Sequence, residues 1–252
     1  MVWYTHCVRS PGEIFNHLLR EIAAASENTR PARVAFDLDS TLFCVSHRSQ
    51  EILKVISEDP ELRGEFQEIC ERLKAVRVLP TDWGIRAAVE RLGLRAPRHL
   101  FERVRDMWAE KFFSNDYLHA DRPYPGAVEF VRELAAAGAQ ILYLTGRDTS
   151  RMGDGTRASL RKWAFPLSDE SALLMKPRAG DDDAAFKRDV LSDLAAKSES
   201  VWFFENEPVI VNLVRREVPA VRIVFVDSVH SGREPAPVDL PTIGMSYHHG
   251  SK

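Results

Sequence analysis

The sequence reads RVAFDLDSTL over residues 33–42, an apolar run that ends in two carboxylates. This pattern predicts a buried strand followed by a chemically active turn. Because side chains at positions i and i+2 of an extended segment point the same way, Asp37 and Asp39 should share one face. Two like charges at the end of a buried strand need a cation or a shared proton to relieve their repulsion. The stretch therefore predicts either a hard-metal site or an acid/base pair.

Composition restricts the classes of protein that need to be considered. A chain of 252 residues, 44% of them hydrophobic, can form one large domain or a domain with an insertion. The formal net charge of -3 gives no basic footprint for nucleic acid, so a small-molecule partner is expected. No stretch approaches the roughly 20 apolar residues of a membrane span, and residues 1–6 lack the pattern of a signal peptide. The sequence makes no prediction about the oligomeric state.

The three cysteines, Cys7, Cys44 and Cys70, are scattered without the spacing of a zinc site. They indicate free thiols in a reducing compartment, and we expect a cytoplasmic protein. Cys44 follows the first motif closely, but a buried and unreactive thiol is the favoured interpretation.

Helical periodicity dominates the first half of the chain. Ser10-Pro11-Gly12-Glu13 predicts a capping box at the start of a helix. From about residue 44 to residue 122 the apolar residues recur only at helical spacing, as in Ile52, Val55 and Ile56. These residues predict an all-helical insertion directly after the first motif.

Strand and helix signals alternate again in the second half. A helix over 127–137, stopped by Gly138, precedes a run of short apolar segments separated by helices. The pattern predicts an α/β fold with a Rossmann-like, three-layer core, in which a parallel sheet is covered on both faces. The carboxyl ends of its strands should then form one ligand-binding edge. The predicted strands are 140–145, 172–175, 201–205 and 221–226.

Polar residues follow the predicted strands where such an edge requires them. Thr145-Gly146-Arg147 ends one strand and Glu205-Asn206-Glu207 ends another. Thr145 offers a hydroxyl, and Gly146 lets backbone N–H groups approach an oxyanion closely. Arg147 is expected to be a solvated or paired surface group.

A lysine near this edge could balance the charge of a bound phosphate. Lys187 lies in the first turn of a predicted helix, where it opposes the helix dipole by about 0.3 to 1 kcal/mol unless an anion is bound nearby. Lys176, directly after the predicted strand 172–175, is the alternative, and Lys187 is favoured. Asp183 is expected to cap the Lys187 helix.

The ordered motifs resemble those of the haloacid dehalogenase-like hydrolase superfamily. They are Asp37-Leu38-Asp39-Ser40-Thr41, Thr145-Gly146-Arg147, Lys187 and Phe204-Glu205-Asn206-Glu207-Pro208. The resemblance implies a Rossmann-like core of residues 1–43 and 123–252, with a helical cap of residues 44–122. It also implies a Mg²⁺-dependent phosphatase that forms an aspartyl-phosphate and acts on a small phosphorylated metabolite.

The same resemblance assigns a role to each motif. Asp37 would attack phosphorus, and Asp39 would protonate the leaving alcohol and then activate water. An anionic nucleophile that meets an anionic phosphate needs cations to cancel the repulsion. The implied metal ligands are Asp37, Asp39 and Glu205, the phosphate-binding residues are Thr145 and Gly146, and the balancing lysine is Lys187.

One motif departs from the family pattern, which usually has aspartates in the fourth position. Glu205 reaches one methylene farther than aspartate, so its contact with the metal could be through water. Glu207 is favoured as the residue that opens the next helix. Two other functions stay open: a catalytically weak protein that binds a phosphorylated ligand, and a phosphotransferase. Ser246–Lys252 are expected to form a mobile tail.

Overall fold

A computed structural model describes residues 10–249 except 27–29, 94–97 and 170–171. Its centre is a six-stranded sheet in which every pairing between neighbouring strands is parallel. The predicted α/β core with a parallel sheet is therefore confirmed. In order across the sheet the strands are β5 (Leu173–Lys176), β4 (Gln140–Asp148), β1 (Ala32–Phe36), β6 (Ser200–Glu205), β7 (Val221–Val226) and β8 (Thr242–Ile243).

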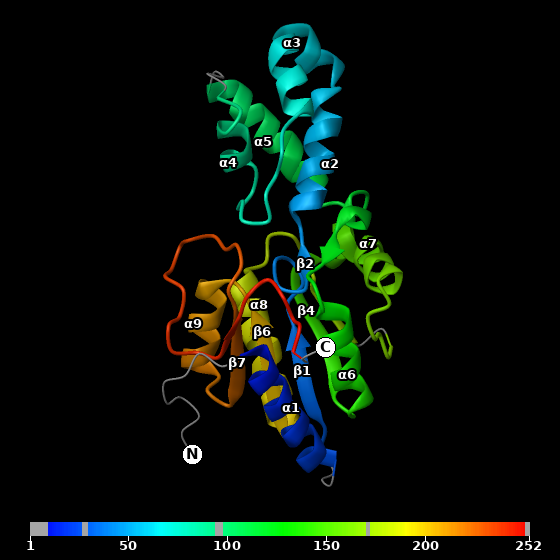
Figure 1. Ribbon diagram of the computed structural model, residues 1–252, viewed down its shortest axis with the longest axis vertical. Coiled ribbons are helices and arrows are strands. Elements are labelled where there is room, and N and C mark those ends of the chain that lie inside the picture. Colours follow the sequence, from blue (N-terminus) through cyan, green and yellow to red (C-terminus); the bar gives the residue numbers. More distant parts are fainter. Residues whose placement is uncertain (1–9, 27–29, 94–97, 170–171, 250–252) are drawn as a thin grey trace.

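Helices cover both faces of this sheet (Figure 1). Along β1 the side chains alternate between two clusters, with Val34 and Phe36 in one and Ala35 in the other. The first cluster includes residues of α1 (Pro11–Ser26) and α6 (Ala127–Ala136), and the second includes residues of α8 (Asp183–Lys197) and α9 (Pro208–Glu217). This is the three-layer arrangement expected when a strand is apolar on both faces. The remaining core helix, α7 (Thr149–Lys162), follows β4.

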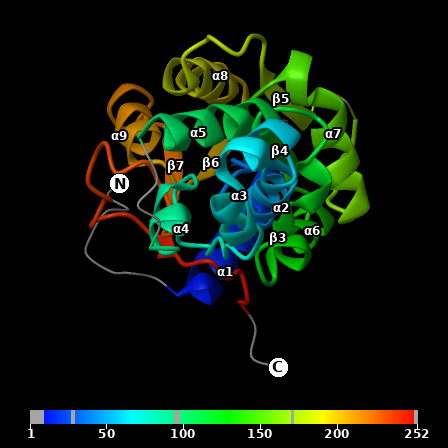
Figure 2. The ribbon, with the colours of Figure 1, turned by 90° about the horizontal axis from the view of Figure 1, so that it is seen from above.

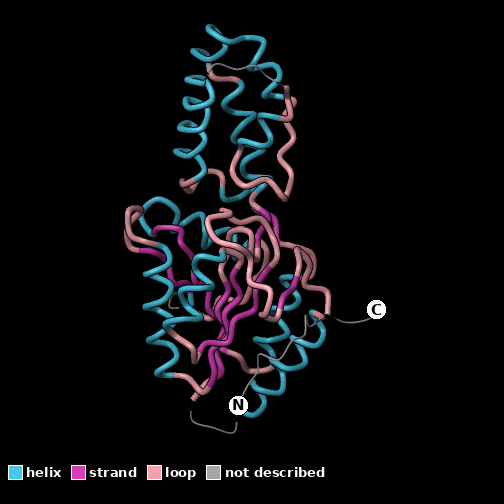
Figure 3. The backbone as a smooth tube through the Cα atoms, turned by 90° about the vertical axis from the view of Figure 1, so that its left-hand side faces the viewer, coloured by secondary structure: helices cyan, strands magenta, loops and turns pink. Residues whose placement is uncertain are grey.

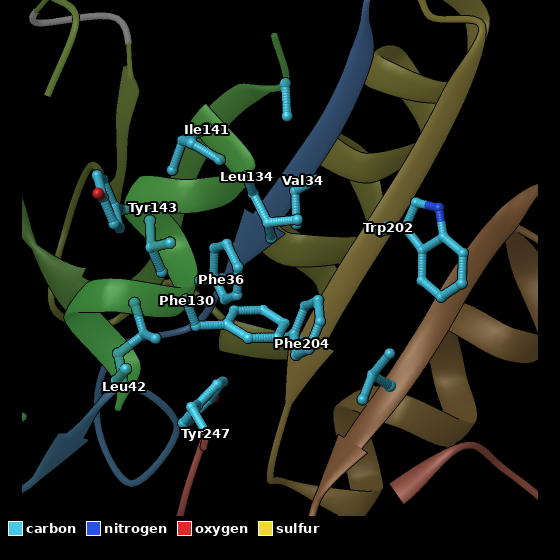
Figure 4. Close-up of a cluster of buried hydrophobic side chains, with 14 of the residues drawn as sticks. Val34, Phe36, Leu42, Phe130, Leu134, Ile141, Tyr143, Trp202, Phe204 and Tyr247 are labelled. Atoms are coloured by element: carbon cyan, nitrogen blue, oxygen red, sulfur yellow. The ribbon is translucent and has the colours of Figure 1, made fainter. Parts of the chain in front are cut away.

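Aromatic rings fill the α1 and α6 side of the core (Figure 4). The Phe36 ring stacks on Phe204 with 4.6 Å between ring centroids, and the edge of Phe130 meets both rings. Tyr247 closes this cluster, and its hydroxyl donates to the Thr41 carbonyl at 3.1 Å. The prediction of a mobile tail is therefore wrong for residues 246–249, because Tyr247 is fully buried. Residues 250–252 lie outside the described part of the chain.

Four helices form a separate layer beyond the carboxyl ends of the strands (Figures 1 and 3). We call this layer the helical insertion; seen along the long axis of the molecule, it stands over the sheet (Figure 2). It has its own apolar cluster, which includes Ile52, Leu73 and Leu100. The helices are α2 (Ser46–Ser57), α3 (Pro60–Lys74), α4 (Arg86–Glu90) and α5 (Arg98–Phe112).

The helical insertion is joined to the core by a short antiparallel ribbon. It pairs β2 (Phe43–Cys44) with β3 (Arg122–Pro123), and the 3-10 helix η1 (Leu118–Ala120) precedes β3. The sequence did not predict this ribbon, because strands of two residues leave no alternating pattern to detect. β8 escaped prediction for the same reason.

Two helix starts test the predictions of capping. At α1 the Ser10 and Glu13 side chains each accept a hydrogen bond from the other's backbone N–H, so the capping box is confirmed. At α8 the N-cap is Asp182, whose carboxylate accepts the Ala185 N–H at 2.7 Å. The assignment of the N-cap to Asp183 is wrong by one residue. None of the described helices has the length and apolar character of a membrane span.

Candidate active site

The turn after β1 places the first motif at the edge of the sheet. β1 ends at Phe36, so both aspartates lie in the turn rather than in the strand. The Asp37 N–H donates to the Phe204 carbonyl at 3.0 Å, which ties the turn to β6. Ser40 adopts a left-handed conformation with φ of 62°, a strain that non-glycine residues show mainly in tightly determined turns. The Thr41 hydroxyl donates to the Asn206 side-chain oxygen at 3.0 Å, linking the first motif to the fourth.

A buried lysine bridges two carboxylates, one in this turn and one at the end of β6. Lys187 Nζ lies 2.6 Å from Asp37 Oδ1 and 2.7 Å from Glu205 Oε2. Each of the three residues is at most 4% exposed. Lys187 therefore contacts the leading aspartate, whereas the alternative lysine, Lys176, pairs with Asp183 at 2.5 Å. We call the group formed by Asp37, Lys187 and Glu205 the lysine cluster.

The lysine cluster carries one more negative charge than positive charge when both acids are ionised. Burial raises the pKa of Asp37, and although Lys187 opposes this effect the shift stays upward. Burial likewise raises the pKa of Glu205 to about 7, against the pull of Lys187. Burial also disfavours the charged form of Lys187, but the two carboxylates outweigh it and raise the pKa of the ammonium. The cluster is therefore short of positive charge.

The donor atoms and charge of this cluster suit a hard divalent cation. Mg²⁺ prefers carboxylate oxygens and is usually held by one or two carboxylates, with water and phosphate oxygens completing its shell. Asp37 and Glu205 supply two such carboxylates. Glu205 Oε1 is fixed by the N–H groups of Asn206 and Glu207, both at 2.9 Å, while Oε2 faces Lys187. Within the described residues no set of three or more His, Cys, Asp and Glu side chains is arranged as a metal site.

Asp39 belongs to a different group, which we call the arginine cluster. Arg48 Nη2 lies 2.7 Å from Asp39 Oδ1, and Arg147 contacts the same oxygen through Nε and Nη2. The two arginines also share Asp121, which accepts from Arg48 at 2.8 and 2.5 Å and from Arg147 at 2.7 Å. Burial opposes ionisation of Asp39, but Arg147 and then Arg48 outweigh it and lower the pKa of that carboxyl well below its usual range.

The arginine cluster contains two residues, Arg48 and Asp121, that were assigned no role from the sequence. Arg48 and Asp121 are fully buried, yet neither follows a strand of the sheet. Their sequence signal is weak, since an arginine in a helix and an aspartate beside a turn usually face solvent. The expectation that Arg147 would be a surface group is wrong, because Arg147 is 3% exposed and bound to two carboxylates.

The predicted phosphate-binding residues lie on β4. Thr145 is buried, and its hydroxyl accepts the Arg147 N–H at 3.3 Å. A Cβ atom on Gly146 would stand 2.8 Å from a carboxylate oxygen of Asp183, so only glycine fits there without a shift. The Glu207 side chain lies apart from both clusters: Glu207 is the N-cap of α9, and its carboxylate accepts hydrogen bonds from Ser231 at 2.7 and 2.9 Å. Of the cysteines, Cys44 and Cys70 are buried and free, whereas Cys7 lies outside the described residues.

The chain was compared with known families, curated proteins and solved structures. The family model of the haloacid dehalogenase-like hydrolases matches residues 32–209. No curated protein matches. Three of the solved structures that are similar to this chain are described next.

The first is a haloacid dehalogenase-like hydrolase from Burkholderia xenovorans, 17% identical, covering 84% of this chain and 91% of its own, with a TM-score of 0.49. The second is a family hydrolase from Streptococcus pneumoniae, 13% identical, with coverage of 84% and 92% and a TM-score of 0.48. The third is a class C acid phosphatase from Bacillus anthracis, 15% identical, with coverage of 78% and 60% and a TM-score of 0.40. The family match covers all three residues of the lysine cluster, and on this match the chain belongs to the haloacid dehalogenase-like hydrolases.

Proposed function

We propose that the protein is a Mg²⁺-dependent phosphomonoester hydrolase that acts through an aspartyl-phosphate. The observation that carries this proposal is the lysine cluster, in which Lys187 holds Asp37 and Glu205 together at the end of the central strands. A buried carboxylate beside a fixed cation is suited to attack an anionic phosphate, because positioning and charge neutralisation supply most of the catalysis of phosphoryl transfer.

The proposed reaction has two displacements at phosphorus. An Asp37 oxygen forms a bond to phosphorus while the ester P–O bond breaks, and the leaving oxygen takes a proton from Asp39. Water then gives a proton to Asp39 and attacks phosphorus, the Asp37–phosphorus bond breaks, and phosphate is released. The Thr145 hydroxyl and the Gly146 N–H would bind phosphoryl oxygens, and Lys187 would balance their charge. Mg²⁺, held by Asp37 and Glu205 with Asp39 as the further predicted ligand, would supply neutralisation of the phosphoryl charge when bound.

The arginine cluster favours one half of this reaction over the other. An ionised Asp39 is ready to take a proton from water, whereas donating a proton to the leaving group requires that Asp39 first leave Arg48 and Arg147. This observation favours, as a second candidate, a protein that binds a phosphate ester and turns it over slowly. A transferase, in which another acceptor replaces water in the second step, would use the same residues.

The helical insertion is proposed as the cap of this enzyme, and residues 1–43 and 123–252 as its core. Its position beyond the carboxyl ends of the strands would limit access to small substrates, here a phosphorylated metabolite rather than a phosphoprotein (Figure 1). The free thiols of Cys44 and Cys70 suit a reducing compartment such as the cytoplasm.

The test is phosphate release from a panel of phosphate monoesters, measured with Mg²⁺ and with EDTA. We expect release with Mg²⁺ that EDTA abolishes and that Asp37→Asn lacks. If the wild-type protein released no phosphate from any ester but bound one with Mg²⁺ by calorimetry, the binding function would replace the hydrolase. Release that persists in EDTA would refute the Mg²⁺ dependence.

A further inference from the structure

A hollow of about 670 Å³ lies where the helical insertion joins the core. Its walls come from α2 of the helical insertion, from η1 and β3, and from the end of α7 in the core. The volume is in the range of sites for small molecules. Its described lining includes none of the residues proposed above to bind the phosphate or the metal. The titratable residues of the lining are His47, Glu51, Lys54, His119, Arg122 and Lys162.

Positive charge predominates in this hollow. Lys54, Arg122 and Lys162 are cations, and Glu51 is the one carboxylate among the described lining residues. Glu51 Oε1 already lies 3.0 Å from His119 Nε2. Three cations against one carboxylate leave an excess of two positive charges when the histidines are neutral. A concave surface with charge of one sign concentrates the electrostatic potential and attracts small ions of the opposite sign.

Two of these cations lack the ion pairs that are common on this surface. Neither the Lys54 ammonium nor the Arg122 guanidinium forms a hydrogen bond or an ion pair with another described residue. Arg63 of α3, by contrast, contacts two carboxylates. Burial and then the nearby Arg122 lower the pKa of His47, against the pull of Asp121. A bound anion would relieve this repulsion between like charges.

Hydrogen bonds across the joint hold the other walls of the hollow in place. Lys162 Nζ donates to the His119 carbonyl at 2.7 Å and lies 5.3 Å from the centre of the Trp163 ring. The Trp163 indole N–H donates to the Asp121 carbonyl at 3.0 Å. Between the two walls, η1 contacts both α2 and α7. The shape of the hollow is therefore built before any ligand binds, which lowers the entropic cost of binding.

We propose that this hollow is a second anion site, which binds a small polyanion of the phosphate class through Arg122, Lys54 and Lys162. Arg122 would hold phosphoryl oxygens with its planar fork of N–H groups, and the two lysines would act as point charges. A ligand with at least two negative charges matches the excess of positive charge. Because Lys54 belongs to α2 and Lys162 to α7, the bound anion would also tie the helical insertion to the core. The site does not require the hydrolase function proposed above.

Calorimetry with inorganic pyrophosphate in EDTA tests the site, because the lysine cluster then has no metal with which to hold a phosphate. Arg122→Gln and Lys54→Gln should each weaken pyrophosphate binding by about tenfold or more, the effect of losing a charge-assisted contact. Arg72→Gln removes the same charge from an exposed position on α3 and should change the affinity by less than about twofold. Thr145→Ala, which alters the proposed phosphate site of β4, should leave pyrophosphate binding unchanged.

Equal affinities in Arg122→Gln, Lys54→Gln and Arg72→Gln would overturn the proposal, as would wild-type protein that binds no pyrophosphate. A loss in Thr145→Ala without one in Arg122→Gln would also overturn it and place the anion in the candidate active site. Arg122→Lys keeps the charge and should restore part of the affinity.

A second titration identifies the source of the phosphate groups. Inorganic pyrophosphate and the diphosphate of ADP offer the same charged oxygens to the hollow. Tighter binding of ADP, lost in Arg122→Gln, would assign the site to a larger organic diphosphate, whereas equal affinities would assign it to the inorganic ion. Loss of pyrophosphate binding in Arg122→Gln supports the second site even if the protein hydrolyses no ester, because neither titration measures turnover.

Discussion

The lysine cluster and the arginine cluster lie at the same edge of the sheet but balance their charges differently. In the lysine cluster two carboxylates share one ammonium group, which leaves one negative charge in excess. In the arginine cluster two guanidinium groups share the carboxylates of Asp39 and Asp121, so the formal charges cancel. The excess of negative charge in the first cluster would be relieved by a further cation or a proton, whereas the formal charges of the second cluster already cancel.

The two clusters also differ in what they connect. The lysine cluster joins the turn after β1 to β6 and α8, all within the core. The arginine cluster joins the core to the helical insertion. Two of its residues come from the turn after β1 and from β4, and the other two come from α2 and from the position directly before β3. The lysine cluster therefore lies within the core alone, whereas the arginine cluster links the helical insertion to the core and also holds Asp39, the proposed acid and base.

The largest expected effect is the loss of the proposed nucleophile. Asp37→Asn should reduce phosphate release by about 10⁴-fold or more, because the covalent step would be lost. Removing a charge from a cluster with an excess of negative charge should leave the melting temperature unchanged or raised. Single-turnover kinetics and thermal unfolding measure the two quantities. Turnover within about tenfold of wild type would reject the nucleophile.

The next effect comes from breaking the arginine cluster. Arg48→Met should lower the free energy of unfolding by about 3 to 5 kcal/mol, because it leaves Asp121 buried with one partner fewer. Arg98→Met removes an arginine whose side chain is 92% exposed and should cost less than about 0.5 kcal/mol. Denaturant titration compares the two variants. Similar losses in both would show that the arginine cluster contributes little to stability.

The lysine cluster was largely predictable from the sequence, and the arginine cluster was not. Asp37, Lys187 and Glu205 are fixed by strand ends and a helix start, features that periodicity and the family motifs locate. Arg48 and Asp121 meet only because a two-residue ribbon brings the ends of the helical insertion together. No local pattern encodes that meeting, and a buried arginine is rare enough that sequence reasoning places it on the surface.

The core, too, has elements that were predictable from the sequence and elements that were not. The strands of four to nine residues were predicted within a few positions, whereas β8 and the buried tail were missed. Tyr247 is buried because its ring packs against Phe130 and its hydroxyl reaches the Thr41 carbonyl, both distant in the chain. Short polar segments of this kind acquire their structure from tertiary contacts rather than from their own propensity.

A smaller effect should appear in the pH dependence of stability without metal. The pKa of Glu205 is raised from 4.5 to about 7 in the folded protein. Below pH 4.5 the Glu205 carboxyl is protonated in both the folded protein and the unfolded chain. Its contribution to the free energy of unfolding is then at its maximum. That contribution falls as the pH rises through about 7, since the unfolded chain then releases a proton that the folded protein retains. We expect a loss on the order of 1–3 kcal/mol between pH 5 and 8.

Denaturant titration in EDTA across this range measures the loss. Glu205→Gln cannot titrate and should show a smaller decline than wild type, while groups elsewhere titrate equally in both proteins. Saturating Mg²⁺ should also reduce the decline in wild type, because a cation favours the ionised carboxylate. Identical slopes for wild type and Glu205→Gln in EDTA would show that Glu205 is already ionised through its contact with Lys187.

The smallest effect concerns the affinity of the lysine cluster for its cation. Glu205→Ala should raise the Mg²⁺ concentration for half-maximal phosphate release by about tenfold or more, and Glu205→Asp should restore part of the loss because it keeps the charge. Glu207→Gln is the matched control, because the Glu207 carboxylate binds Ser231 and neither cluster. The loss in Glu205→Ala should exceed that in Glu207→Gln. If the Mg²⁺ dependence were unchanged in Glu205→Ala, the cation would be held by other groups and the excess charge of the lysine cluster would need another explanation.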